Sequence, residues 1–322
     1  MGVREEVLGA LEAARGEHLS GAALARRLSV SRNAVWKAVE ALRGEGYRVE
    51  STSLGYRLSE DTDRLSAPGI ARFLEERSFY RLTARRQVDS TNLELKSLAA
   101  QGAPEGTVLV AEAQSAGRGR MGRSFFSPEG TGAYFSILLR PAIAAREALN
   151  LTTVAAVAVA EAIGHVARRE ARIKWVNDVL VDDRKVCGIL TEASLDLESG
   201  GLEYAVVGIG LNVRPPEGGL PEELSGIAGT IYEADPPGDA RCALVAEVLN
   251  GFCRYYRALD QKAWLPAYRA RSAVLGRSIE VISTAGARRA LATAIDDEFR
   301  LHVRYEDDTE EALSSGEVST RL

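Results

Sequence analysis

The hydrophobic pattern of this 322-residue chain changes twice along its length. In the first part, apolar residues recur at helical spacing in three short segments, at 3–15, 20–28 and 31–42. Strand-like and helical runs then alternate, and from Leu275 onward only short alternating runs remain. We therefore predict three units, at 1–62, 63–271 and 272–322, joined at the first boundary by the polar stretch 59–68.

The first unit has the pattern of a winged helix-turn-helix. Its third helix, capped by Ser31, is predicted to bury Val35 and Val39, and a hairpin follows at 47–58. Such a helix enters the major groove of DNA. Residues 1–60 carry nine basic against eight acidic side chains, so DNA affinity must come from their placement. The predicted DNA contacts are Ser31, Arg32, Asn33, Trp36 and Lys37 of the helix and Arg57 of the hairpin.

The second unit is predicted to be a mixed α/β domain, and the third a small all-β module. Gly200 and Gly201, with Ser199, separate two strand-like runs and predict an antiparallel hairpin, hence a mixed rather than parallel sheet. The strand-like runs are 106–113, 132–139, 185–193 and 204–213, and the helical ones 92–100, 149–169 and 241–257.

Composition excludes several classes of protein. A net charge of −5 with 46% hydrophobic and 26% charged residues is typical of a soluble globular chain. The N-terminus carries early acids, and no run approaches the length of a membrane span, so we expect a cytoplasmic protein without membrane contact. Three cysteines without CxxC spacing and three histidines far apart in sequence indicate neither a disulfide scaffold nor a zinc site.

The strongest local motif is 117–123, with the sequence GRGRMGR. Its glycines allow close approach of the backbone to a ligand, and its arginines suit carboxylate or phosphate groups. A dinucleotide fingerprint would have to open a helix, and the following residues do not read as one. Of the 40 basic residues 35 are Arg, so Lys174 and Lys185 stand out in the motifs that follow.

Four other motifs are ambiguous when each is taken alone. The segment 89–92 reads as a helix cap, 174–178 as a core tryptophan beside a solvated turn, and 208–212 as a strand end. Each also places polar side chains or glycines where a ligand could converge. The remaining motif, 185–190, begins seven residues after Asp178.

Together these motifs resemble those of the biotin protein ligases with an N-terminal repressor head. The resemblance rests on DSTN at 89–92, Gln114, GRGRMGR at 117–123, KWVND at 174–178, KVCGIL at 185–190, GIGLN at 208–212 and GEVSTR at 316–321, with SRNAVWK at 31–37 and GYRL at 55–58 in the head. Three residues depart from the family pattern: Val176 replaces a proline, Leu54 a basic residue of the wing and Phe299 a glycine.

The resemblance implies two half-reactions. Biotin attacks the α-phosphorus of ATP, with Mg²⁺, to give biotinyl-5′-AMP and pyrophosphate; a lysine of a biotin carboxyl carrier protein then takes the biotinyl group. Biotin and ATP are substrates here, and no permanently bound cofactor is expected. The resemblance also implies an SH3-like C-terminal barrel and a ligand-loaded homodimer that represses transcription at operator DNA.

Residue roles follow by matching the motifs. The residues implied for biotin are Ser90, Thr91, Asn92, Gln114, Gly117, Arg118, Gly119, Arg120, Lys185 and Gly188. Those implied for the nucleotide are Arg120, Arg123, Lys174, Asn177, Asp178 and Asn212. Lys185, Arg118 and Arg120 are the catalytic candidates, and Asp178 would contact Mg²⁺ or orient a lysine.

Two other functions remain open on the sequence alone. One is a ligand-sensing transcription factor without ligase activity, against which the retention of Lys185 and the loop arginines argues. The other is a lipoate–protein ligase, a relative with a similar central fold. The head and the C-terminal motif favour biotin.

Overall fold

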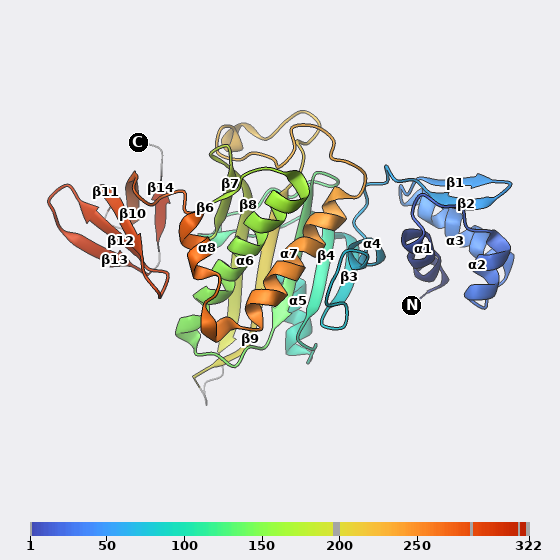
Figure 1. The fold of residues 1–322 in the computed structure, drawn as a ribbon, viewed down its shortest axis with the longest axis horizontal. Helices are drawn as coiled ribbons and strands as arrows, with labels where there is room; N and C mark the ends of the chain where they lie inside the picture. Colours follow the sequence, from blue (N-terminus) through green and yellow to red (C-terminus); the bar gives the residue numbers. More distant parts are fainter. Residues whose placement is uncertain (1, 196–199, 284–285, 315, 320–322) are drawn as a thin grey trace.

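Three parts follow one another along the long axis of the protein (Figure 1). The structure, a computed structural model, describes residues 2–195, 200–283, 286–314 and 316–319. The helical head lies at one end, a seven-stranded sheet with its helices in the middle and a five-stranded sheet at the other end. Ser199, Thr320 and Arg321 of the motifs above lie outside the described residues.

The head is the predicted winged helix-turn-helix. Ser31 caps its third helix by accepting a hydrogen bond from the Ala34 amide at 3.1 Å. Val35, Val39 and Leu42 of that helix are fully buried in the core of the head. Leu54, at the tip of the hairpin, is exposed. The elements are α1 (Val3–Ala13), α2 (Gly21–Arg27), α3 (Arg32–Gly44), β1 (Val49–Thr52) and β2 (Gly55–Leu58).

The central sheet is mixed, as predicted. Its strand order is β3-β4-β5-β9-β8-β7-β6, and within it only the β3–β4 pair is parallel. The strands are β3 (Arg81–Val88), β4 (Thr107–Gln114), β5 (Gly132–Leu139), β6 (Arg172–Lys174), β7 (Asp178–Val181), β8 (Arg184–Leu195) and β9 (Leu202–Asn212). The pairing of β8 with β9 confirms the expected antiparallel hairpin.

Helices cover both faces of this sheet. In Figure 1, α6 (Leu149–Ala162), α7 (Ala240–Tyr256) and α8 (Leu265–Ala270) lie in front of the strands, and α5 (Thr91–Ala100) lies behind them. A short helix, α4 (Ala67–Ala71), follows the head. The stretch Ala145–Ala167, which includes α6, is long and apolar enough to cross a membrane, but 72% of its most apolar window is buried. It is therefore a core helix, which supports a soluble protein.

The C-terminal sheet is antiparallel, with strand order β13-β12-β11-β10-β14. Phe299, in the turn before β12, docks this sheet on the central domain: its ring stacks on Trp264 at 5.8 Å and meets Tyr268 edge-on at 5.3 Å. Its φ of 59° lies in the left-handed region that glycine adopts readily. The strands are β10 (Ser278–Ser283), β11 (Gly286–Ile295), β12 (Leu301–Tyr305), β13 (Glu310–Leu313) and β14 (Glu317–Ser319).

The polar stretch after the head differs from a solvated linker. Thr62, Leu65 and Ser66 are all buried. Hydrogen bonds hold it: the Leu65 amide donates to Glu112 of β4 at 2.8 Å, and Arg241 of α7 donates to the Asp63 carbonyl at 2.6 Å. We refer to residues 60–66 as the strap.

Candidate functional site

A cavity of about 300 Å³ lies at the N-terminal end of α5, against β8 and β9. Residues from several elements far apart in the sequence line it, including Gly316 and Val318 of the C-terminal sheet region. All but one of the predicted biotin and nucleotide residues line it: Ser90, Thr91, Asn92, Gln114, Arg118, Gly119, Arg120, Arg123, Lys174, Asn177, Asp178, Lys185, Gly188 and Asn212.

Gly117 is the predicted site residue that is not in the cavity lining. A Cβ atom at this position would lie 2.4 Å from the Phe125 carbonyl oxygen and 2.8 Å from Ser127 Oγ. The Gly117 carbonyl in turn accepts a hydrogen bond from the Phe125 amide at 2.8 Å. In this structure Gly117 therefore shapes the loop by permitting a close backbone approach, while its neighbours face the cavity.

A buried hydrogen-bond chain forms the cavity wall at the start of α5. The Thr91 amide donates to Gln114 Oε1 at 2.9 Å, and Gln114 Nε2 donates to Ser127 Oγ at 3.0 Å. Ser136 Oγ, fully buried on β5, lies 2.7 Å from Thr91 Oγ1 and 2.6 Å from Asn92 Oδ1. These polar groups are mutually satisfied, which makes the wall rigid before any ligand arrives.

The glycine–arginine loop makes a single tight turn, Arg120–Gly122, and no helix follows it. The Gly119 amide donates to the Arg123 carbonyl at 2.7 Å, which closes the turn. Met121 at its tip has a φ of 55° and is 78% exposed. The loop is therefore not the helix-opening fingerprint of dinucleotide-binding folds.

Arg120 joins the loop to two other parts of the chain. Its guanidinium donates to Asn177 Oδ1 at 2.8 Å and to the Gly316 carbonyl at 3.4 Å. Asn177 Nδ2 donates to the Ile189 carbonyl of β8 at 3.0 Å. The turn that carries Asn177 keeps its polar residues although Val176 replaces proline, and the Trp175–Val176 peptide bond is cis.

Lys185 and Asp178 form an ion pair inside the cavity, with 2.7 Å between Nζ and Oδ1. Facing strands place them: Asp178 begins β7, and Lys185 lies near the start of β8. The backbone of Lys185 also holds a loop over the site, because its amide donates to the Ile227 carbonyl and its carbonyl accepts from the Gly229 amide, both at 2.9 Å. The pairing favours a lysine-orienting role for Asp178.

Most of the lining residues outside the predicted set of site residues are apolar or glycine. Phe125 packs over the two strands: a Cβ at Gly210 would lie 2.5 Å from its ring, and one at Gly188 would lie 3.1 Å from it. The sequence signal for Phe125 was the presence of glycines on paired strands that face an aromatic loop residue. No sequence motif indicated the apolar lining residues of the segment 220–228. Of the lining residues not predicted individually, Met121, Trp175, Ile189, Leu190, Gly208, Ile209, Gly210, Gly316 and Val318 lie within the motifs identified in the sequence, and Ser124, Phe125, Phe126, Leu220, Leu224, Ile227 and Ala228 lie outside them.

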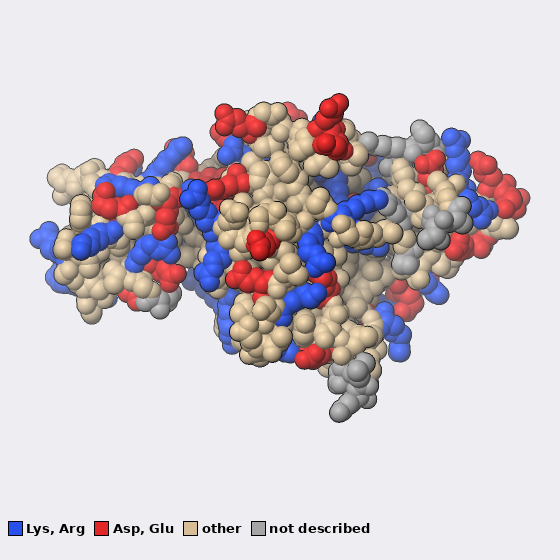
Figure 2. Space-filling view, turned by 180° about the vertical axis from the view of Figure 1, so that it is seen from behind, with Lys and Arg blue, Asp and Glu red and all other residues tan. Residues whose placement is uncertain are grey.

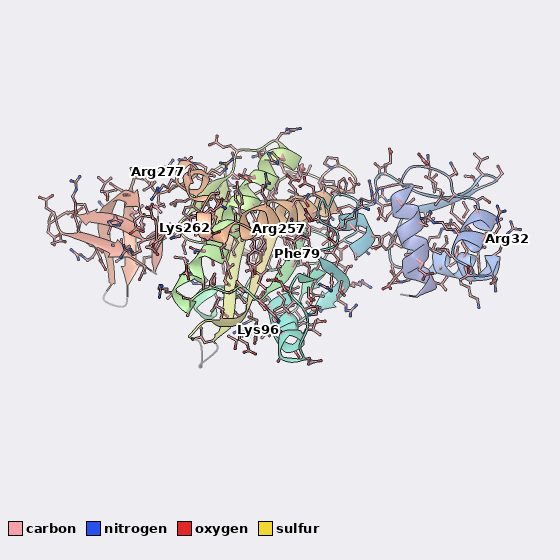
Figure 3. The ribbon with its side chains drawn as sticks, turned by 60° about the horizontal axis from the view of Figure 1, so that its bottom comes forward. Arg32, Phe79, Lys96, Arg257, Lys262 and Arg277 are labelled. Carbon is pink, nitrogen blue, oxygen red and sulfur yellow. The ribbon has the colours of Figure 1, made fainter. Side chains whose placement is uncertain are left out.

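The predicted DNA contacts form a separate surface on the head. Arg32, Asn33, Trp36 and Lys37 are exposed on α3, and Arg32 lies at the far end of the molecule (Figure 3). Arg57 of the hairpin is paired with Glu50 at 2.8 Å. Figure 2 shows acidic and basic side chains interspersed on the head, in line with its nearly balanced charge.

Comparisons with known proteins agree with this arrangement. Residues 83–212 match the biotin/lipoate A/B protein ligase family, and residues 3–57 match a helix-turn-helix domain family. The bifunctional ligase/repressor BirA of Bacillus subtilis is 35% identical over 301 residues, which cover 92% of each chain. The chain belongs to the family of bifunctional biotin ligases and repressors.

Other relatives and solved structures support the same assignment. The Escherichia coli protein of that name is 35% identical over 201 residues, or 62% of this chain and 61% of that protein. The Aquifex aeolicus biotin protein ligase in complex with biotin and ATP has a TM-score of 0.62 and 28% identity, covering 75% of this chain and 98% of that one. The predicted fold class and the ligase–repressor assignment are thus confirmed, whereas the individual residue roles remain predictions.

Proposed function

We propose that this cavity activates biotin with MgATP and transfers the biotinyl group to a lysine of an acceptor protein. The observation that carries the proposal is the convergence of Lys185, Arg118 and Arg120 on one cavity. The first step brings a carboxylate against a triphosphate, so catalysis requires positioning and positive charge rather than a protein nucleophile.

In the first step a biotin carboxylate oxygen bonds to the α-phosphorus of ATP, and the bond from that phosphorus to the bridging oxygen breaks to release pyrophosphate. Arg120, oriented by Asn177, and Lys185, oriented by Asp178, would stabilise the charge on the phosphoryl oxygens. In the second step the acceptor amine attacks the carbonyl carbon, loses a proton, and AMP leaves.

The other roles follow from where residues lie around the cavity. Ser90, Thr91, Asn92, Gln114 and Gly188, with the loop glycines, would hold biotin beside Phe125. Arg123, Lys174 and Asn212 would hold the nucleotide. Asp178 would orient Lys185 through their ion pair, and as the carboxylate among the described lining residues it is also the candidate contact for the Mg²⁺ that accompanies the nucleotide.

The partners and the setting complete the proposal. We infer a biotin carboxyl carrier protein as acceptor, operator DNA bound by α3 and the wing, a homodimer, and a cytoplasmic location. We also propose 1–62, 63–271 and 272–322 as the three units. Lipoate is the second candidate acid, because the matched family includes lipoate ligases; competition between the two acids for activation decides between them.

The direct test is to incubate the protein with biotin, MgATP and a biotin-acceptor domain and to measure the mass of the acceptor. We expect a gain of one biotinyl group on a lysine. Lys185→Ala should slow the gain by roughly 10²–10³-fold, the usual effect of losing one charge-stabilising donor. Lys262→Ala, which removes a lysine held by Asp297 and Glu298 outside the cavity, is the matched control. Wild-type turnover by Lys185→Ala would refute the assigned role.

A further inference from the structure

Glu192 lies on β8 directly beyond the cavity lining. Alternate residues of a strand share a face, so Gly188, Leu190 and Glu192 point the same way. Gly188 and Leu190 line the cavity, whereas Glu192 contacts two lining residues, Asn92 and Arg118. None of the motifs identified in the sequence includes Glu192.

One carboxylate oxygen of Glu192 is anchored in the protein. Its Oε2 accepts a hydrogen bond from Asn92 Nδ2 at 2.9 Å. Asn92 is itself buried: its Nδ2 also faces the Leu190 carbonyl at 3.2 Å, and its Oδ1 lies 2.6 Å from Ser136 Oγ. Because both neighbours of Nδ2 are acceptors, the amide has one favourable orientation, and it holds the carboxylate in place.

The other oxygen faces two cations. Oε1 lies 2.9 Å from Nζ of Lys96 on α5 and 3.5 Å from the Arg118 guanidinium of the glycine–arginine loop. Lys96 is labelled in Figure 3. Burial raises the pKa of Glu192, but the hydrogen bonds from Lys96 and Asn92 and the two positive charges outweigh it, so the pKa lies below its usual value. Glu192 is therefore ionised at neutral pH.

The ion pair between Glu192 and Arg118 is weak. Lys96 lies closer to the shared oxygen than Arg118 does, and the Arg118 side chain is 46% exposed. A partly exposed charge pair of this kind contributes little energy, and its hydrogen bond uses only Nη1 of the guanidinium. The other N–H groups of Arg118 can therefore meet an arriving carboxylate while the pair with Glu192 persists.

We propose that Glu192 is a positioning residue, which keeps the Arg118 guanidinium at the rim of the cavity so that its other N–H groups can bind the carboxylate of the acid substrate. This inference rests on the proposed role of Arg118 in binding that carboxylate. Lys96 shares the charge of Glu192, so the pair with Arg118 stays weak enough for the guanidinium to adjust to that carboxylate.

The test is Glu192→Gln, which keeps the size of the side chain and removes its charge. We expect the KM for biotin to rise roughly two- to fivefold, in line with the loss of one partly exposed charge pair, with kcat nearly unchanged. Glu203→Gln is the matched control, because Glu203 lies on the neighbouring strand β9 and accepts a hydrogen bond from Ser194 outside the cavity lining. Unchanged thermal midpoints establish that both variants fold.

The sign of the effect is decisive, because removing a negative charge by itself would attract the substrate carboxylate more strongly and lower the KM. A lower or unchanged KM overturns the proposal. In the Arg118→Ala background, Glu192→Gln should have no further effect on KM; an equal rise in both backgrounds also overturns it.

The same cycle separates this inference from its basis. If Arg118→Ala alone leaves the KM for biotin unchanged, the assignment of Arg118 fails and this proposal fails with it. The ligase function is tested independently by the mass gain of the acceptor with unsubstituted protein.

Discussion

Arg15 and Arg241 donate hydrogen bonds to adjacent carbonyls of the strap, although Arg15 belongs to the head and Arg241 to α7. Arg15 donates to the carbonyls of Thr62 and Glu60, and Arg241 donates to that of Asp63 at 2.6 Å. The strap is thus bound by the head through Arg15 and by the central domain through Arg241. The placement of the head on the ligase is set by specific contacts rather than by a flexible connection.

Arg241 should be essential for stability. Its guanidinium is almost fully buried between Glu112 and Asp63, at 2.6 and 2.9 Å. Arg241→Met removes the guanidinium closest to both carboxylates, and we expect the free energy of unfolding to fall by about 3–5 kcal/mol. Urea denaturation measures the free energy of unfolding. The control Arg254→Met, on the exposed side of the same helix, should change this free energy by less than about 1 kcal/mol. Similar losses in both variants would contradict the buried network.

Arg15 should hold the head in place. It also pairs with Glu12, which is 1% exposed and is shared with Arg72 at 3.1 Å. Arg15→Met removes the strap contacts from the side of the head, so we expect faster cleavage of the strap by added protease, with biotin transfer retained. Arg43→Met, which breaks a surface pair within the head, is the control. Equal cleavage rates in the two variants would mean that the strap does not depend on Arg15.

Phe299 should dock the C-terminal sheet on the central domain. We expect Phe299→Ala to lower the free energy of unfolding by about 3–5 kcal/mol through loss of its contacts with Trp264 and Tyr268. Because φ is 59° at this position, Phe299→Gly should be less destabilising than Phe299→Ala, the reverse of the usual order. Equilibrium unfolding of the two variants decides; a more stable alanine variant would refute the conformational argument.

Asp296 should make the stability of the protein dependent on acid pH. Burial raises its pKa, but hydrogen bonds from His302 and from Arg300 and Glu298 outweigh that effect and lower it to about 2, from a usual value of 3.8. The folded state therefore favours the ionised form of Asp296. Its contribution to stability is fully present above pH 3.8 and is lost as the pH falls toward 2.

Asp296→Asn tests this dependence. At neutral pH the variant should be less stable than the unsubstituted protein, and the difference should shrink as the pH is lowered through that window. Thermal midpoints recorded as a function of pH measure the difference. A difference that stays constant down to pH values near 2 would contradict the assignment.

Local patterns in the sequence were enough to predict the separate parts of this protein. Helical spacing with Ser31 as a cap predicted α3, and strand-like runs predicted β4, β5, β8 and β9, because local periodicity decides which face of an element can be buried. The strands β3, β6 and β7 were not predicted. The order of the motifs also predicted nearly all the polar residues of the cavity, since arginine, lysine and amide side chains beside glycines suit an anionic ligand whatever their arrangement.

How those parts meet depends on contacts between residues far apart in the sequence. Gly316 reaches Arg120, Glu192 reaches Arg118 and Arg241 reaches Asp63 across separations of 196, 74 and 178 residues. Such contacts follow from strand order and from the docking of whole domains, which local periodicity does not encode. The ion pairs at the cavity and at the strap could therefore not be predicted from the sequence, because the fold brings their distant side chains together.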